Sequence, residues 1–251
     1  MIDPFWAVYF TLLVFLLGAC IGSFLNVCIH RIPREESIVH PRSHCPSCSQ
    51  LIAWYDNLPM LSYFLLRGRC RHCRAVISPR YALVEMLTAV LFLAVWNVYG
   101  WDARTPVYLV MVGGLLLGTF VDLEHYIIPD RVSLGGMATG LLFSALVPAL
   151  HQETAPGPAL LSSVIGLAAG AGSLFIVGEL GRLVLKKDAM GLGDVKLLGG
   201  IGAYLGWTGV LFTVLVSSLI GSVVGIALIL CGKREWQGRL PYGPFLAVGA
   251  L

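Results

Sequence analysis

Four cysteines early in the chain have the spacing of a metal site. Cys45-Pro-Ser-Cys48 and Cys70-Arg-His-Cys73 are two C-x-x-C pairs with 21 residues between them, which is close to the spacing of zinc knuckles. Each pair can supply two thiolates to one tetrahedron, and four thiolates leave no open position for water. The sequence therefore predicts a structural Zn²⁺ site made by these four thiols, with disulfides or a redox-active C-x-x-C as alternatives.

Two aspartates lie at the ends of apolar segments, where a charged side chain is costly. Asp122 closes one apolar run, and Asp194 opens another directly after Gly191-Leu-Gly193. Two carboxylates that share a site hold one proton between them, so one can activate a water molecule while the other polarises a scissile carbonyl. We predict Asp122 and Asp194 as the catalytic pair of an aspartic peptidase. Asp130 is the rival for the first role, and simple interfacial caps are the alternative for both.

The elements that position these groups are long apolar segments. The 251-residue chain is 57% hydrophobic and 12% charged, with a mean hydropathy of +0.81, which excludes a disordered or ordinary water-soluble protein. No acidic or basic tract suggests nucleic acid as a partner. The predicted fold is an all-α polytopic membrane protein with seven or eight transmembrane helices. Its apolar runs are 5–27, 81–99, 105–121, 132–150, 159–184, 195–207, 210–231 and 240–251.

The distribution of Lys and Arg predicts the orientation in the membrane. These residues collect on the cytoplasmic side of membrane proteins. If the polar segment 28–80 is cytoplasmic, alternation of the spans places every one of the 17 Lys and Arg inside except Arg104. The prediction is an N-terminus outside and both aspartates at the cytoplasmic surface, where packing of run 105–121 against run 195–207 would bring them together.

The same pattern predicts three regions along the chain. Residues 1–27 form the first transmembrane helix, residues 28–80 a cytoplasmic zinc-binding loop, and residues 81–251 the transmembrane peptidase core. The loop is too short to build a conventional hydrophobic core, so a covalent or metal crosslink is expected to hold it together.

Several motifs, in their order along the chain, resemble those of the bifunctional type IV prepilin peptidases. The G-x-G-D at residues 191–194 would be weak evidence alone, but the full set of motifs covers nearly the whole chain. The motifs are Gly22-Ser-Phe-Leu-Asn-Val-Cys28, the paired C-x-x-C loop, Ser78-Pro-Arg-Tyr81 followed by Glu85, the segments 122–130 and 191–196, and Pro241-Tyr-Gly-Pro244-Phe-Leu-Ala247.

The resemblance implies a bacterial inner-membrane aspartic endopeptidase whose substrates are membrane-anchored type IV prepilins or pseudopilins. Members of this family remove a short basic leader after a Gly and then methylate the new N-terminus from S-adenosylmethionine. Their catalytic aspartates match Asp122 and Asp194, and their cysteine tetrad matches the four cysteines above. Gly68 matches a glycine that the family links to methylation, although a turn glycine beside the metal is an equal reading.

Two other functions stay open at this point. A proton-coupled transporter also uses paired intramembrane carboxylates, and a zinc-stapled membrane assembly factor needs no activity at all. The methyltransferase half leaves little trace in the sequence, because no G-x-G-x-x-G follows a predicted strand. The resemblance places that activity in residues 28–80.

Overall fold

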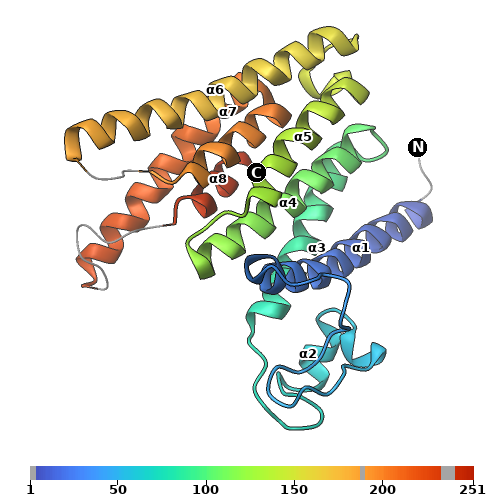
Figure 1. Ribbon diagram of the computed structural model, residues 1–251. Coiled ribbons are helices and arrows are strands. Elements are labelled where there is room, and N and C mark those ends of the chain that lie inside the picture. Colours follow the sequence, from blue (N-terminus) through green and yellow to red (C-terminus); the bar gives the residue numbers. More distant parts are fainter. Residues whose placement is uncertain (1–3, 187–189, 233–240) are drawn as a thin grey trace. The chain divides into compact units, whose positions relative to one another are not determined.

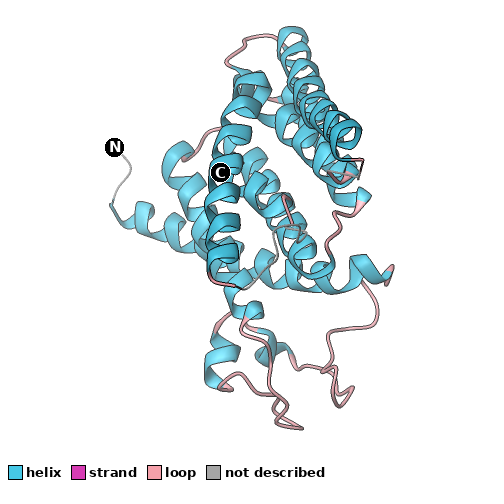
Figure 2. Ribbon diagram, turned by 90° about the vertical axis from the view of Figure 1, so that its left-hand side faces the viewer, coloured by secondary structure: helices cyan, strands magenta, loops and turns pink. Residues whose placement is uncertain are grey.

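The protein is all-helical. The computed structural model describes residues 4–186, 190–232 and 241–251, and within these ranges it contains no β-strand (Figure 2). This confirms the predicted fold class. Lys187, Lys233, Arg234 and Arg239, which enter the charge argument, lie outside the described residues. The helices are α1 (Pro4–Arg31), α2 (Leu61–Leu65), α3 (Arg80–Tyr99), α4 (Arg104–His125), α5 (Asp130–Leu146), α6 (Pro156–Leu185), α7 (Leu192–Leu230) and α8 (Gly243–Ala250).

The helices identify a polytopic membrane protein. Within the described ranges, five segments are long and apolar enough to span a bilayer. α5 has 17 residues and α8 has eight, against the roughly 20 that a span needs. α7 covers two of the predicted runs and is interrupted at Gly206, where φ is 70° and ψ is 179°. The count of seven or eight spans stays a prediction. The five segments are Phe5–Arg34, Arg80–Tyr99, Arg104–His125, Pro156–Val184 and Leu192–Leu230.

The chain divides into two compact units, Met1–Leu117 and Gly118–Leu251. In the first unit, α1 lies along α3, and the loop that carries α2 connects them (Figure 1). Glycines permit this close approach: a Cβ on Gly18 would lie 2.7 Å from Ala89 Cα, and one on Gly22 would lie 2.7 Å from Glu85 Cα. This is the small-residue packing expected between membrane helices.

In the second unit, α7 packs against α5, α6 and α8. The first half of α7 is buried from Leu197 to Tyr204. Its contact with α6 is so close that a Cβ on Gly166 would overlap the carbonyl oxygen of Gly202. Because a buried, closely packed helix cannot easily shift, the start of α7 gives Asp194 a rigid support.

Candidate active site and metal centre

Asp122 lies in the last turn of α4 and is 5% exposed. The backbone N–H of Gly243 donates a hydrogen bond of 3.1 Å to Asp122 Oδ2. This N–H is available because α8 begins at Gly243, and the first N–H groups of a helix have no partner within it. A Cβ on Gly243 would lie 2.8 Å from the same oxygen. Only glycine can therefore approach the carboxylate this closely.

Asp194 lies in the first turn of α7, which begins after Gly191. Its carboxylate is near enough to Asp122 for a direct electrostatic interaction. The adjoining helix ends also meet: a Cβ on Gly118, one turn before Asp122, would lie 3.9 Å from Leu197 Cδ1, one turn after Asp194. This contact places the ends of the two apolar runs next to each other, and with them two acids that are 72 residues apart in the sequence.

Ile128 supports both acids from the segment between α4 and α5. Its side chain is buried. A Cβ on Gly193 would lie 3.1 Å from Ile128 Cβ, and a Cβ on Gly243 would lie 3.1 Å from Ile128 Cδ1. Since Gly193 precedes Asp194 and Gly243 binds Asp122, one apolar side chain sets the position of the backbone beside each carboxylate.

Asp130, the rival for the first role, is engaged in a different contact. It lies in the first turn of α5, and its carboxylate forms an ion pair of 2.6 Å with Lys196 Nζ on α7. The Asp130 side chain is 64% exposed. This pair links the starts of two helices at the surface of the unit, whereas Asp122 is buried.

The four cysteine thiols of the first unit form one cluster. The sulfur atoms of Cys45, Cys48, Cys70 and Cys73 all lie within 4.8 Å of one another, and the Sγ atoms of Cys45 and Cys73 are 3.8 Å apart. A regular tetrahedron with Zn–S bonds of about 2.3 Å has sulfur–sulfur edges of about 3.8 Å. The cluster therefore fits a tetrahedral metal ion.

Two equivalent turns build this cluster. In each turn the N–H of the first cysteine, Cys45 or Cys70, donates at 2.9 Å to the carbonyl oxygen five residues later. The residue after the second cysteine has a positive φ in both turns, 57° at Ser49 and 61° at Arg74. The C-x-x-C spacing thus encodes the same local conformation twice, and each copy presents two sulfurs.

Two of the four thiols, those of Cys70 and Cys48, have different pKa values when no metal ion is bound. Backbone N–H groups of Cys73 and His72 lower the pKa of Cys70 to about 6. At Cys48 the N–H of Gln50 lowers the pKa, but desolvation and the three neighbouring thiols outweigh it and raise the pKa to about 11. A bound metal ion would favour the thiolate form of both groups.

Gly68 lies in the turn between α2 and the second cysteine pair. Its φ is 63°, and its N–H donates to the carbonyl oxygen of Tyr63 at 2.8 Å. A Cβ on Gly68 would lie 3.0 Å from Tyr63 Oη. The conformation and the tight contact both require glycine at this position.

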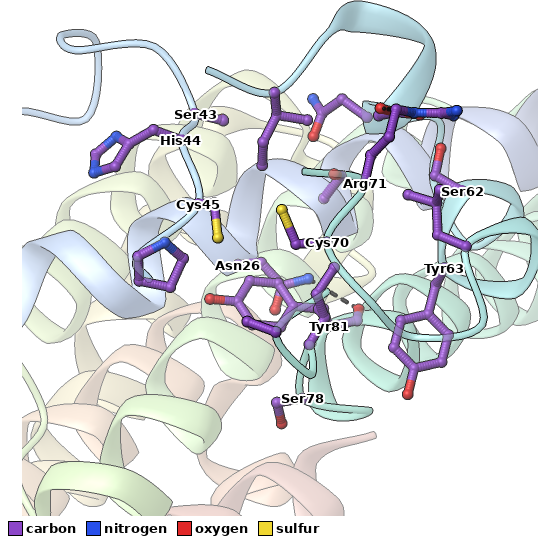
Figure 3. Close-up of a pocket in the computed structure, with 18 of the residues that line it drawn as sticks. Asn26, Ser43, His44, Cys45, Ser62, Tyr63, Cys70, Arg71, Ser78 and Tyr81 are labelled. Carbon is purple, nitrogen blue, oxygen red and sulfur yellow. Dashed lines mark hydrogen bonds and ion pairs between the residues drawn. The ribbon is translucent and has the colours of Figure 1, made fainter. Parts of the chain in front are cut away.

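A cavity of about 530 Å³ lies within the first unit, between α1, the start of α3 and the cysteine loop (Figure 3). Tyr63 lines it, while Gly68 is not among the lining residues. Asn26 of α1 donates from Nδ2 to the Tyr81 carbonyl oxygen at 3.0 Å. Glu85 of α3 accepts at Oε2 from the N–H of Met60 at 2.6 Å. Two buried polar side chains therefore form part of the cavity wall.

Comparison with known proteins assigns the chain to a family. The family described as the bacterial peptidase A24 N-terminal domain matches residues 16–99, and the type IV leader peptidase family matches residues 109–226. A prepilin leader peptidase/N-methyltransferase of Aeromonas hydrophila is 39% identical over 266 residues, which cover 96% of this chain and 88% of the relative. This chain belongs to the type IV leader peptidase family.

Other proteins of the type IV leader peptidase family agree with this assignment. The prepilin leader peptidase/N-methyltransferase of Pseudomonas aeruginosa is 34% identical over 265 residues and is covered to 88%. The one of Myxococcus xanthus is 41% identical over 225 residues, and the chain spans 65% of its length. No solved structure matches the chain. The predicted resemblance is confirmed, the family supports a peptidase with methyltransferase activity, and the transporter alternative has no support.

Sequence reasoning did not single out Gly243 or Ile128 as neighbours of the acids. Gly243 lies at the start of α8 and donates its backbone N–H to Asp122. The signal for Gly243 was its position between two prolines. Nothing in the local sequence marks Ile128, because its role depends on two glycines that lie far from it along the chain.

Proposed function

We propose that this member of the type IV leader peptidase family cleaves type IV prepilins or pseudopilins after the Gly that ends their leader, with Asp122 and Asp194 as the catalytic residues. The observation that carries this proposal is the shared support of two carboxylates from distant helices: Gly243, which binds Asp122, and Gly193, which precedes Asp194, both pack against Ile128. Asp122 is buried and held by the Gly243 N–H. Asp194 is half-buried. Two carboxyl groups held close together are what aspartic proteolysis requires.

The two acids would divide the work of hydrolysis. The ionised carboxylate takes a proton from water, whose oxygen attacks the scissile carbonyl carbon, while the protonated carboxyl donates a hydrogen bond to the carbonyl oxygen. The tetrahedral intermediate then collapses, the C–N bond breaks, and the leaving nitrogen receives a proton. Because the substrate is also membrane-anchored, its cleavage junction would reach the pair by diffusion within the membrane surface.

The test compares conservative variants of three aspartates in the purified full chain. Asp122→Asn and Asp194→Asn should each lower prepilin cleavage by at least about 10³-fold, because each removes one of the two acid–base groups. Asp130→Asn is the matched control and should cleave nearly as fast as the wild type. Full cleavage by either of the first two variants would reject the catalytic pair.

We place the protein in the inner membrane with its N-terminus outside, and with the loop and both acids at the cytoplasmic face. The positions of Lys and Arg support this orientation. Residues 28–80 are then the cytoplasmic methyltransferase region, and residues 81–251 contain the peptidase core.

For the second activity we propose that Cys45, Cys48, Cys70 and Cys73 hold a structural Zn²⁺ and that the loop methylates the new N-terminus of the cleaved pilin. S-adenosylmethionine would supply the methyl group. The four sulfur atoms, which all lie within 4.8 Å of one another, support the metal. Mass spectrometry of a processed substrate reports the cleavage site and the added methyl group together, and one Zn²⁺ per chain is the expected metal content.

A further inference from the structure

The cavity of the first unit is lined by Asn26, a buried side chain whose amide oxygen accepts no hydrogen bond from the protein. Asn26 is 2% exposed, and its Oδ1 atom has no hydrogen-bond partner. A buried amide oxygen without a partner costs free energy. It therefore points to a ligand that donates a hydrogen bond inside the cavity.

Glu85 adds a negative charge to the same cavity. It is 8% exposed. Its partners are neutral, namely the N–H of Met60 and the hydroxyl of Ser23, and within the described ranges no Lys or Arg forms a salt bridge with it. A buried carboxylate without a counter-ion favours the binding of a cationic group.

Among the other charged groups that line the cavity, Glu36 is exposed, whereas Asp56 and Arg31 already have partners. Asp56 forms a bidentate pair with Arg71, at 2.5 and 2.7 Å, and Arg31 donates to the carbonyl oxygens of Ser37 and Pro41. The Arg71 guanidinium thereby holds the pKa of Asp56 below its usual range. The charge available to a buried ligand is thus the carboxylate of Glu85.

The size and the remaining lining of the cavity fit a small molecule with an aromatic part. Its volume lies within the range of about 300–1,000 Å³ typical of small-molecule sites. Tyr63 and Tyr81 line it together with aliphatic side chains, and Figure 3 shows both tyrosines with Cys45 and Cys70 around the same space.

We infer that this cavity binds S-adenosylmethionine, with Glu85 facing one of its cationic groups and Asn26 Oδ1 accepting from one of its N–H donors. This inference rests on the proposed methyltransferase function. The ligand combines an aromatic adenine, a sulfonium and an ammonium group, so it supplies the donor, the positive charge and the flat apolar surface that the cavity is missing. Gly68 then acts as a positioning residue, because it supports the ring of Tyr63.

The experiment measures binding of labelled S-adenosylmethionine to the purified full chain by equilibrium dialysis, without any methylation step. Glu85→Gln keeps an oxygen to accept from Met60 and removes only the charge. It should weaken binding by at least about tenfold, the effect of losing one charge-assisted hydrogen bond. Asn26→Leu should also weaken binding. Glu35→Gln is the matched control, since this exposed carboxylate belongs to the same unit but does not line the cavity.

Two further measurements keep the outcomes separate. Metal content and prepilin cleavage in the same preparations show whether a variant is folded. If Glu85→Gln loses its metal, donor binding by Asn26→Leu tests the cavity assignment instead. Wild-type affinity in a folded variant of either residue overturns the cavity assignment while leaving the proposed function intact. A wild-type chain that cleaves prepilin but neither binds the donor nor methylates overturns both. A weaker affinity for the basic leader, with donor binding unchanged, assigns the cavity to the leader and also rejects the inference.

Discussion

The two units of this protein build their sites in opposite ways. In the first unit, the four clustered cysteines come in pairs three residues apart, and each pair lies in a turn closed by its own backbone hydrogen bonds. In the second unit, the acids lie on α4 and α7, and the N–H that holds Asp122 comes from a third segment 121 residues away. The geometry of the first site is therefore sensitive to loss of one of its own cysteines. The geometry of the second is sensitive to enlargement of the small residues where the helices touch.

Loss of a metal ligand should have the largest effect in the first unit. Cys70→Ser removes one of four thiolates, and structural zinc sites contribute on the order of 10–16 kcal/mol to the folding of small domains. We expect a metal content near zero, loss of N-terminal methylation, and a much smaller loss of cleavage. Metal analysis and mass spectrometry of the product check this. Equal loss of both activities would show that the two sites depend on each other, and Cys20→Ser is the control thiol outside the cluster.

Gly243→Ala should have the largest effect among variants that keep both acids. The new Cβ would lie 2.8 Å from Asp122 Oδ2 and must displace the carboxylate. A shift of about 1 Å in a catalytic group can cost about 10²-fold in rate, and we expect a loss of that size in cleavage. Kinetics on a prepilin, with methylation of a pre-cleaved peptide as a second assay, would measure it.

A control substitution in the second unit tests whether the loss comes from the contact of the new methyl group or from any replacement of glycine by alanine. Gly225 of α7 has open space around its Cβ position, so Gly225→Ala should cleave like the wild type. A normal rate in Gly243→Ala would contradict the view that small residues at contacts decide this site.

Gly68→Ala should have a smaller effect, restricted to methylation. An alanine at a φ of 63° is strained by about 1 kcal/mol or more, and its Cβ presses on Tyr63. We expect methylation to fall by roughly fivefold or more, the factor that corresponds to this energy, while cleavage is unchanged. Gly232 also has a positive φ but open surroundings. If Gly232→Ala lowers methylation equally, the contact with Tyr63 is not the cause.

Breaking the Asp130–Lys196 pair should have the smallest effect. Exposed ion pairs contribute about 0.2–1 kcal/mol, and Asp130 is 64% exposed. Lys196→Gln and Asp130→Asn should each reduce cleavage by less than about fivefold, and the double variant should be no worse than the stronger single one. A loss of about 10²-fold in Lys196→Gln alone would instead show that this ammonium acts on Asp194.

The sequence predicted the all-helical membrane fold and the cysteine cluster because both follow from short-range rules. Apolar runs long enough to cross a bilayer form helices, and both C-x-x-C pairs of this chain close the same turn. The number of spans was harder to predict, since α7 contains two apolar runs and one break at Gly206. Composition alone does not distinguish a break within a helix from a loop between two helices.

Three features could be predicted without the structure: the residue types that carry the chemistry, the lipid environment of the helices and the turns that gather the thiols. Each of them depends on residues that are close together along the chain. Only the tertiary structure decided that Gly243 holds Asp122, that Asp130 pairs with Lys196, and that Asn26 and Glu85 share one cavity. These contacts depend on how helices that are far apart in the sequence pack together. Their packing free energy comes from complementary side-chain surfaces, which cannot be read from the order of the residues.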